Sequence, residues 1–418
     1  MLVLAGCYTS HERAATDLPI DVDASIRSPL CPAPTNGDGR TLLVLHDPEI
    51  GPLTLSRREP DGTYRTITRE LFSPMPFLQA LPGGAHAVVG LDAGSAELVE
   101  LETGVVRPLA SLLPPDAVAT CGRDGPGVAN GFVIQGRADG RALLYGCSRY
   151  ADGAPGGEAR IVGGAVWEVS LESFEAREVA TGCAKASYPV GAPCDVQVTW
   201  RSCPGSDAVD AAVRSELRRI DGSVHPLRAR SWALSPSTQL ALGDGDAPHE
   251  LLVIDAAGRE RRVLESVDVE GPLRFGLLLR RDGAALVFDR GSTFLVTTTQ
   301  TSPPLPGACS EEGGVAFVGA SPDGALLVRG CSASARWSSL DLRAPAATRS
   351  LPELDGVRGA VVGWSHDGAH WLIDTWAAMG DEARATLVSR DGEVVARVHA
   401  TEPELGEVHD VAFAFPAD

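Results

Sequence analysis

The chain has 418 residues, of which 44% are hydrophobic and 5% aromatic, and its formal net charge at pH 7 is −19. The apolar content is sufficient for a large core and excludes a mainly disordered chain, while the acidic balance disfavours binding to nucleic acid. No run of about 18 apolar residues is present, so the sequence predicts no transmembrane helix. The 46 glycines and 30 prolines favour many short elements over long helices.

The N-terminus reads Met-Leu-Val-Leu-Ala-Gly-Cys, and its last four residues resemble the lipobox of bacterial lipoproteins. We interpret residues 1–7 as a truncated lipoprotein signal, because its charged and long apolar regions are missing, and Cys7 as the lipidation site. The alternative is an ordinary apolar N-terminus with a chance cysteine. Residues 8–36 are polar, contain proline and lack periodicity, which is typical of a flexible tether. The resemblance implies a bacterial cell-envelope protein, anchored by lipid in the outer membrane and facing the periplasm or the cell surface.

A turn of the Ser-Pro-Asp-Gly type recurs along the rest of the chain, and each copy precedes a run of apolar residues. Pro presets φ, Asp bonds to the backbone, and Gly takes the positive φ with which the next strand begins. The apolar run after each turn predicts a strand buried on both faces. Degenerate copies lie at 193–196 and 235–238. The residues assigned to the other turns are Asp38, Gly39, Gly83, Gly84, Asp139, Gly140, Asp282, Gly283, Asp323, Gly324, Asp367 and Gly368.

Between these turns lie pairs of more alternating strands, each pair around a turn of its own. Two buried inner strands followed by two outer strands with a wetter face, repeated at about 45 residues, is the pattern of a β-propeller blade. Residues 37–418 are therefore predicted to form an all-β domain, a single β-propeller of four-stranded antiparallel blades. Eight blades are expected, or seven if one degenerate copy is an insertion. The strand pairs lie at 53–68, 96–109, 166–179, 216–227, 251–264, 293–305, 337–351 and 385–398.

The two ends of this region are expected to meet. Residues 408–418 read as an inner strand that runs into a turn and stops. If this strand pairs with the N-terminal strands, it closes the ring of blades and removes its free edges. A helical pattern is confined to 207–219, which predicts a short helix inserted in the fourth blade.

The repeated turns resemble the WD-repeat-like units of TolB-like propellers, in a degenerate form over about residues 37–418. This resemblance implies a monomeric, non-enzymatic binding or scaffolding module with a protein partner in the envelope and no cofactor. The alternative is a propeller hydrolase or lyase with its site at the mouth of the central channel, since a fold does not decide a function. Polar residues of three or more blades converging at one rim would favour the enzyme. The few histidines do not recur at one repeat position, which favours binding.

One segment, 363–368, nearly matches the Gly-x-Ser-x-Gly elbow of serine hydrolases. Asp367 replaces the final glycine, and Ser365 lies on a repeat turn at which other copies carry Ser321 and Ser235. An elbow also requires a strand-to-helix turn. We therefore predict a structural role for Ser365 and assign no catalytic residue.

Histidine residues offer a second, weaker signal. His366 and His370 are four residues apart, and on a strand this spacing directs both side chains to one face. They would form a metal site only if His409 or Asp374 converged with them. Core or solvated histidines are far commoner, so no metal is assigned.

Apart from Cys7 the chain has eight cysteines, none in a Cys-x-x-Cys pair, and such an even, scattered set fits disulfides of an oxidising compartment. Three cysteines each stand seven residues after the last position of a repeat turn, and each has another cysteine upstream on the preceding strand. A hairpin places such positions at bridging distance. The predicted pairs are Cys121–Cys147, Cys183–Cys203 and Cys309–Cys331, with Cys31–Cys194 left by elimination.

Peptide mapping under non-reducing conditions is expected to recover Cys121 joined to Cys147, and Cys309 joined to Cys331. Each bridge closes a loop within one blade and contributes about 3 kcal/mol on the chain-entropy model. Reduction is therefore expected to lower the thermal midpoint. A peptide that joins Cys121 to any other cysteine would contradict the blade register on which the pairing depends.

Overall fold

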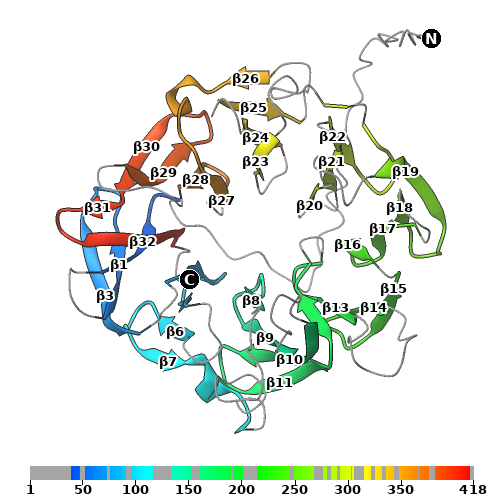
Figure 1. Ribbon diagram of the computed structural model, residues 1–418, viewed down its shortest axis with the longest axis horizontal. Helices are drawn as coiled ribbons and strands as arrows, with labels where there is room; N and C mark the ends of the chain where they lie inside the picture. Colours follow the sequence, from blue (N-terminus) through cyan, green and yellow to red (C-terminus); the bar gives the residue numbers. More distant parts are fainter. Residues whose placement is uncertain are drawn as a thin grey trace, which may run out of the picture.

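The computed structural model is a single all-β propeller whose strands form antiparallel sheets around a central axis (Figure 1). The structure describes residues 39–47, 52–72, 76–90, 96–115, 133–151, 160–189, 192–200, 214–228, 230–243, 249–267, 276–279, 284–289, 292–302, 304–305, 315–321, 325–331, 336–342, 348–365, 367–375 and 382–414. Its strands within these ranges group into eight sheets, numbered here in chain order.

Sheet 1 contains β1 (Leu42–Asp47), β2 (Leu53–Arg58), β3 (Tyr64–Leu71), β31 (Thr401–Glu402) and β32 (Gly406–Phe413). Sheet 2 contains β4 (Leu78–Ala80), β5 (His86–Val89), β6 (Glu97–Glu100) and β7 (Val106–Pro108). Sheet 3 contains β8 (Val133–Gly136), β9 (Ala142–Ala151), β10 (Arg160–Ser170) and β11 (Ala176–Thr181). Sheet 4 contains β12 (Ala184–Ser187), β13 (Val196–Trp200), β14 (Arg214–Arg218) and β15 (Val224–Leu227).

Sheet 5 contains β16 (Ser231–Ser235), β17 (Thr238–Leu242), β18 (His249–Ile254) and β19 (Glu260–Val267). Sheet 6 contains β20 (Gly276–Leu279), β21 (Ala285–Asp289) and β22 (Ser292–Val296). Sheet 7 contains β23 (Val315–Ala320), β24 (Leu326–Cys331), β25 (Trp337–Asp341) and β26 (Thr348–Ser350). Sheet 8 contains β27 (Ala360–Trp364), β28 (His370–Asp374), β29 (Ala383–Ser389) and β30 (Val394–His399). Two 3₁₀ turns, Leu109–Leu112 and Pro352–Leu354, follow outer strands.

Burial follows the distinction between inner and outer strands that the sequence predicts. The second strand of sheet 8, β28, is buried at every position, and β1 is buried at all but its last residue. The outer strand β26 is exposed throughout, and β15 is exposed at all but its last residue. Apolar side chains therefore lie between neighbouring sheets, where both faces of the inner strands are covered.

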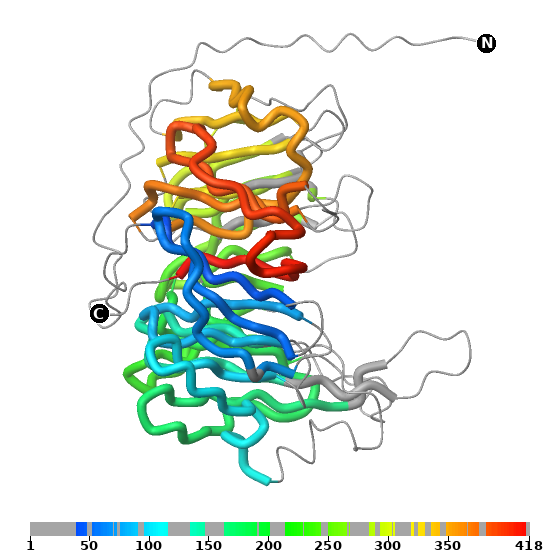
Figure 2. Tube along the Cα trace, turned by 90° about the vertical axis from the view of Figure 1, so that its left-hand side faces the viewer, coloured from blue at the N-terminus to red at the C-terminus, as the bar shows by residue number. Residues whose placement is uncertain are grey.

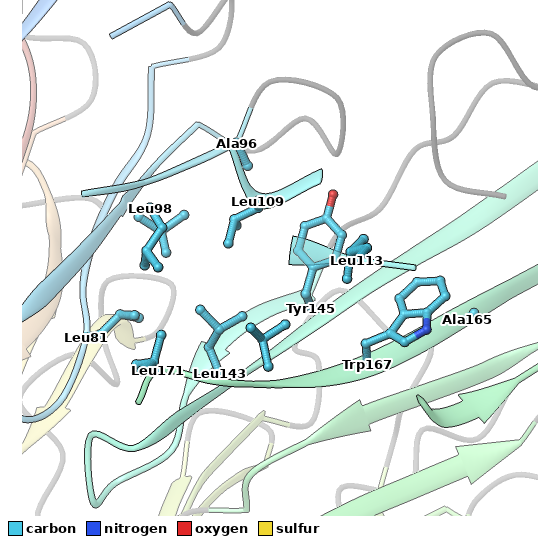
Figure 3. Packing of buried hydrophobic residues seen from close by; sticks show 12 residues of the cluster. Leu81, Ala96, Leu98, Leu109, Leu113, Leu143, Tyr145, Ala165, Trp167 and Leu171 are labelled. Atoms are coloured by element: carbon cyan, nitrogen blue, oxygen red, sulfur yellow. The ribbon is translucent and has the colours of Figure 1, made fainter. Parts of the chain in front are cut away.

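The packing between sheets 2 and 3 illustrates this core (Figure 3). Leu98 and Leu109 of sheet 2 belong to one buried cluster with Leu143, Tyr145 and Trp167 of sheet 3. Each of these side chains is at most 4% exposed. Burying such side chains contributes about 1.5–3 kcal/mol each, so the contact between sheets, rather than any isolated sheet, stabilises the propeller.

The repeat turns of neighbouring sheets contact one another. Gly140 closes its turn with a backbone hydrogen bond to Arg137 O and has φ +71°. A Cβ added at Gly140 would lie 2.5 Å from Pro82 O and 2.8 Å from the Cα of Gly83, in the corresponding turn of sheet 2. Glycine is thus required here twice over, by the positive φ and by the close approach of a second backbone.

The segment predicted as a helix contains a strand instead. Its residues 214–218 form β14, which pairs with both β13 and β15, while residues 207–213 lie outside the described part of the chain. Ser215 and Leu217 are buried, whereas Arg214 is exposed and Glu216 and Arg218 are partly exposed, so burial follows the period of a strand. Pairing on both sides overrides the helical propensity of the segment.

The described strands from the two ends of the propeller region share one sheet. β32 pairs with β1 in antiparallel register from Leu42↔Phe413 to Asp47↔Glu407, with a bulge between Leu45 and His46. Figure 2 shows these strands, red and blue, running side by side. The sequence-based expectation for the C-terminal strand extends to residue 418, and residues 415–418 lie outside the described part.

Gly140→Ala is expected to lower the unfolding free energy much more than Gly222→Ala, as measured by denaturant unfolding. Both glycines have positive φ, which costs a non-glycine residue about 1–2 kcal/mol. Only at Gly140 does the added Cβ also meet backbone, since nothing lies within 4 Å of a Cβ at Gly222. We expect a loss of at least about 3 kcal/mol for Gly140→Ala. Equal losses in the two variants would show that the turns of sheets 2 and 3 do not pack tightly.

Candidate functional site

A buried cluster of charges lies where sheets 8, 1 and 2 meet. Arg384 on β29 places Nη1 2.6 Å from Oδ1 of Asp374, the last residue of β28. Its Nη2 lies 3.9 Å from Oδ1 of Asp410 on the innermost strand β32. The side chains of Arg384, Asp374 and Asp410 are 12%, 6% and 16% exposed. The cluster therefore holds two carboxylates and one guanidinium away from bulk water.

Backbone groups complete this charge cluster. Nε and Nη2 of Arg384 both donate to His409 O, at 3.0 and 2.7 Å. Oδ2 of Asp410 accepts a hydrogen bond from Leu78 N at 2.7 Å, and its Oδ1 accepts one from Val411 N at 2.8 Å. Leu78 begins β4, so Asp410 joins the inner strand of sheet 1 to that of sheet 2. Both carboxylate oxygens of Asp410 are thus engaged in bonds that position strands.

The electrostatics of Asp410 are governed by burial. Loss of hydration raises the pKa of its carboxyl, and this effect outweighs the opposing hydrogen bonds from Leu78 and Val411 and the attraction of Arg384. The Asp410 carboxyl thus combines a raised pKa with oxygens that accept hydrogen bonds from two backbone N–H groups. It resembles a group that holds inner strands together more than a solvent-accessible acid or base.

His46 forms a second polar contact beside the chain junction. The ring is 4% exposed, and its Nδ1 lies 2.9 Å from Leu405 O while its Nε2 lies 2.9 Å from Ser56 Oγ. Burial lowers its pKa, against the opposing effect of the bond to Leu405 O. A neutral ring with its proton on Nδ1 donates to the carbonyl and accepts from the hydroxyl. His46 thus links β1, β2 and the turn before β32.

Two glutamines bridge neighbouring sheets through their side-chain amides. Gln135 on β8 donates to Tyr188 O and accepts from Tyr188 N, both at 2.9 Å. Gln197 on β13 donates to Ser231 O at 2.6 Å and accepts from Ala233 N at 3.1 Å, in the inner strand of sheet 5. Each amide forms with the next sheet the donor and acceptor hydrogen bonds that a strand backbone would form. Side-chain amides therefore join sheets 3, 4 and 5, as Asp410 joins sheets 1 and 2.

A charged network reinforces the contact between sheets 3 and 4. The Tyr188 hydroxyl donates to Oε1 of Glu168 at 2.8 Å. Arg137 and Arg177 pair with the same carboxylate at 3.3 and 2.6 Å. Burial raises the pKa of Tyr188 strongly, and the Glu168 charge raises it further. The tyrosine therefore remains a neutral donor, which is a structural role rather than that of a reactive phenolate.

The structure places Ser365 inside its turn. The hydroxyl donates to Oδ1 of Asp367 at 2.6 Å and accepts from His370 N at 2.9 Å, and the residue is 2% exposed. Ser321 bears the same relation to its own strand, since Leu326 N donates to its Oγ at 2.9 Å. The shared geometry shows that this serine position organises the repeat turn.

This turn also contacts the next sheet in the ring. A Cβ added at Gly39 would lie 2.7 Å from Ser365 Cβ and 3.0 Å from Nδ1 of His370. Gly39 precedes β1, so sheets 1 and 8 meet at their repeat turns. The repeat-turn residues Asp38, Asp282, Gly283, Asp323 and Gly324 lie outside the described residues.

A metal site would require His409 or Asp374 to lie near His366 and His370, and the structure brings parts of two of these residues together. Asp374 and the backbone of His409 both contact Arg384, while His366 lies outside the described residues. In the ranges that the structure describes, no group of three His, Cys, Asp or Glu side chains could hold a metal ion.

The cysteine pairings fall mainly on residues beyond the described part of the chain. Cys183 and Cys194 are both disulfide-bonded. Cys147 and Cys331 are described only as backbone positions in β9 and β24, and the remaining cysteines, Cys7, Cys31, Cys121, Cys203 and Cys309, lie outside the described residues. The four pairings themselves stay predictions.

Sequence reasoning missed Arg384, Asp410, Gln135 and Gln197. Their signal is a polar residue inside an otherwise apolar strand, as in the run Val-His-Asp-Val-Ala-Phe around Asp410. Such a residue is buried only if it finds partners. The partners here are backbone groups of other sheets, which the sequence does not mark.

No protein-family profile matches the sequence, and no curated protein matches it. Several solved structures resemble the fold. A eukaryotic initiation factor matches 91% of this chain and 100% of its own, with 10% identity and a TM-score of 0.49. An oligogalacturonate lyase from Vibrio parahaemolyticus matches 82% and 85%, with 12% identity and a TM-score of 0.45. TolB from Acinetobacter baumannii matches 81% of each chain, with 14% identity and a TM-score of 0.35. At these values the likeness concerns the fold and assigns no function.

His46→Gln is expected to reduce the loss of stability on acidification. The folded state lowers the pKa of His46 below its ordinary value, so the stabilisation is present above that ordinary value and is lost as pH falls through the lowered pKa. Glutamine can donate and accept but does not titrate. Below about pH 6.5, the wild-type unfolding free energy should fall more steeply than that of the variant, by up to about 1.4 kcal/mol per pH unit. His225→Gln, at an exposed position on β15, is the control and should keep the wild-type slope. Identical slopes for all three proteins would contradict the role of His46.

Proposed function

We propose that this chain is a non-enzymatic β-propeller, anchored in the bacterial cell envelope, that serves as a binding or scaffolding module for a protein partner. One observation carries the proposal. Three polar side chains on described inner strands hold neighbouring sheets together. Asp410, Gln135 and Gln197 each bond to the backbone of the next sheet.

The enzyme alternative has a weaker basis in the described residues. Its criterion is the convergence of polar side chains from three or more blades. In the charge cluster, Arg384 and Asp374 come from sheet 8 and Asp410 from sheet 1, while sheet 2 contributes only the backbone of Leu78. Both oxygens of Asp410 accept backbone hydrogen bonds. This arrangement favours the scaffold reading over the enzyme reading.

We also propose that each of the eight sheets is one blade and that the pairing of β32 with β1 closes the ring. Two observations support this reading. In sheets 3, 5, 7 and 8 the first strand lies towards the axis and the last strand lies outside (Figure 1). Sheets 8 and 1 also meet at their repeat turns, through Ser365 and Gly39. A closed ring leaves its surface loops as the variable part, and loops on rigid scaffolds commonly carry binding.

For attachment we propose a lipid on Cys7, with residues 8–36 as a tether and 37–418 as the propeller. No helix within the described ranges is long and apolar enough to cross a membrane. A single acyl chain gives only marginal membrane binding, so stable attachment to the outer membrane requires multiple acylation. The partner is expected to present a basic surface, because the chain carries a net charge of −19.

The chain should remain with the membrane fraction when it is expressed in a bacterial host behind a complete lipoprotein leader ending in Leu-Ala-Gly-Cys. Mass spectrometry of the N-terminal peptide is expected to find lipid on Cys7, and Cys7→Ser should move the protein to the soluble fraction. An exported protein with an unmodified Cys7 thiol would contradict the anchor.

The same cells test the binding role. Carbodiimide joins carboxylates to lysine amines. It suits this chain, which has 55 acidic residues and a single lysine, Lys185, because the carboxylates of the chain can be coupled to lysines of a partner. The wild type should give an adduct of defined mass that is lost in Cys7→Ser, since only the anchored protein meets its partner. A wild type that yields no more adduct than Cys7→Ser would argue against an envelope binding module.

A further inference from the structure

Arg329, on the second strand of sheet 7, is the largest charged side chain buried in the propeller. It is 0% exposed. Among the described residues, no group accepts a hydrogen bond from Nε, Nη1 or Nη2 of its guanidinium, although all three nitrogens are buried. Burial lowers its pKa. Within the described part of the chain, its five N–H donors therefore have no acceptor.

A second unpartnered polar group lies beside it. Ser338 on β25 is the cross-strand partner of Arg329, and its Oγ is also buried without a hydrogen bond among the described residues. Directly opposed residues of neighbouring strands have Cβ atoms about 5 Å apart and point to the same face of the sheet. The guanidinium and the hydroxyl are thus neighbours on one face of sheet 7.

The face in question is the one that packs on sheet 6. Leu327, two residues before Arg329 on the same face, belongs to a buried cluster with Leu286 and Leu295 of sheet 6. Leu340, the cross-strand partner of Leu327, belongs to it as well. Arg329 and Ser338 continue this face, so their polar groups lie at the margin of an apolar contact between sheets 6 and 7.

An uncompensated guanidinium in this place is unfavourable. Arginine stays protonated in proteins, so it cannot escape the cost of burial by losing its charge. An unpaired buried charge costs a large part of the net stability of a folded domain. Two other arginines with little exposure are compensated by carboxylates, Arg384 by Asp374 and Arg137 by Asp139 and Glu168. Arg329 requires an anion that compensates its charge as these carboxylates compensate Arg384 and Arg137.

We propose that Arg329 and Ser338 form a binding site for a small carboxylate ligand between sheets 6 and 7. The guanidinium fork binds a planar carboxylate through two parallel hydrogen bonds, and the serine hydroxyl donates a third. One guanidinium neutralises one negative charge, which favours a monoanion over a phosphate dianion. The apolar side chains of Leu327 and Leu340 suit a ligand that has an aliphatic body behind its carboxylate.

The burial of the site sets its kinetics. Because Arg329 is fully buried, a ligand reaches it only when the contact between sheets 6 and 7 opens locally. Exchange is therefore slow compared with binding at a surface pocket. This site is distinct from the proposed contact with a protein partner, and neither proposal depends on the other.

Thermal unfolding of the exhaustively dialysed full chain tests the proposal, with acetate, propionate and butyrate as probes and chloride and phosphate as reference anions at equal ionic strength. The wild-type midpoint should rise with the logarithm of carboxylate concentration, as ligand binding to the folded state requires. Arg329→Met, which keeps the length and removes the charge, should have a midpoint at least as high as the ligand-free wild type and no carboxylate response. Ser338→Ala should respond with an affinity reduced about tenfold, consistent with one charge-assisted hydrogen bond.

The control is Ser339→Ala, at the adjacent position on the opposite face of β25, which should keep the wild-type response. If Arg329→Met does not fold, the Ser338→Ala and Ser339→Ala pair still tests the site. A wild type without a carboxylate response overturns the proposal, and so does an equal response in Arg329→Met. A phosphate response as large as that to acetate overturns the assignment to a carboxylate. A folded Arg329→Met that is less stable than the ligand-free wild type would show that the chain itself compensates the charge, which also overturns it.

Discussion

The pairing of β32 with β1 is the contact on which the charge cluster around Arg384 and the bonds of His46 depend. It places β32, residues 406–413, beside β1, residues 42–47, so residues far apart in the sequence share one sheet. Asp410 thereby comes within reach of Leu78 in sheet 2 and Arg384 in sheet 8. His46 is brought to Leu405 by the same register. Without this strand pair, buried charges and an imidazole would lose their partners together, at a cost of several kcal/mol.

Arg329 and Arg384 show how differently one residue type can be accommodated. Arg384 lies near the start of β29 at a junction of sheets, where the last residue of β28, Asp374, supplies a carboxylate and His409 of β32 supplies its carbonyl. Arg329 lies within a strand, where ladder bonds already occupy the neighbouring backbone groups. Its own face offers leucines and the hydroxyl of Ser338. Position along the strand therefore decides whether the protein itself can compensate a buried guanidinium.

Much of the fold could be predicted from the sequence because its signals are local. The turn of Gly140 and the apolar run after it predict a hairpin with a buried second strand, and the structure contains both. The helix expected over 207–219 is wrong at residues 214–218, which form a strand held between β13 and β15. The strand pair expected over 216–227 is confirmed by the pairing of β14 with β15. The two expectations overlap, and pairing on both sides outweighs the helical composition of the segment.

The candidate site was less predictable, because its contacts join different sheets. Ser365 could be assigned to a turn from the repeat alone, and its bonds to Asp367 and His370 are local. The bond of Asp410 to Leu78 spans 332 residues, and nothing near either residue marks the other. In a single sequence, a buried Asp and an exposed Asp differ only by their apolar neighbours. Long-range polar partners therefore become visible only once the sheets are placed.

Those long-range bonds also distinguish sheets that otherwise resemble one another. The apolar contact between two blades is non-directional and would tolerate a shift of one sheet against the next. The amide of Gln197 bonds both Ser231 O and Ala233 N, and this fork fits the inner strand of sheet 5 in one register only. The carboxylate of Asp410 has the same effect on sheet 2, because a shift would leave it buried without the Leu78 donor. Polar groups thus define the alignment of neighbouring sheets that apolar packing stabilises, which explains why Asp410 and Gln197 bond to the backbone of the next sheet.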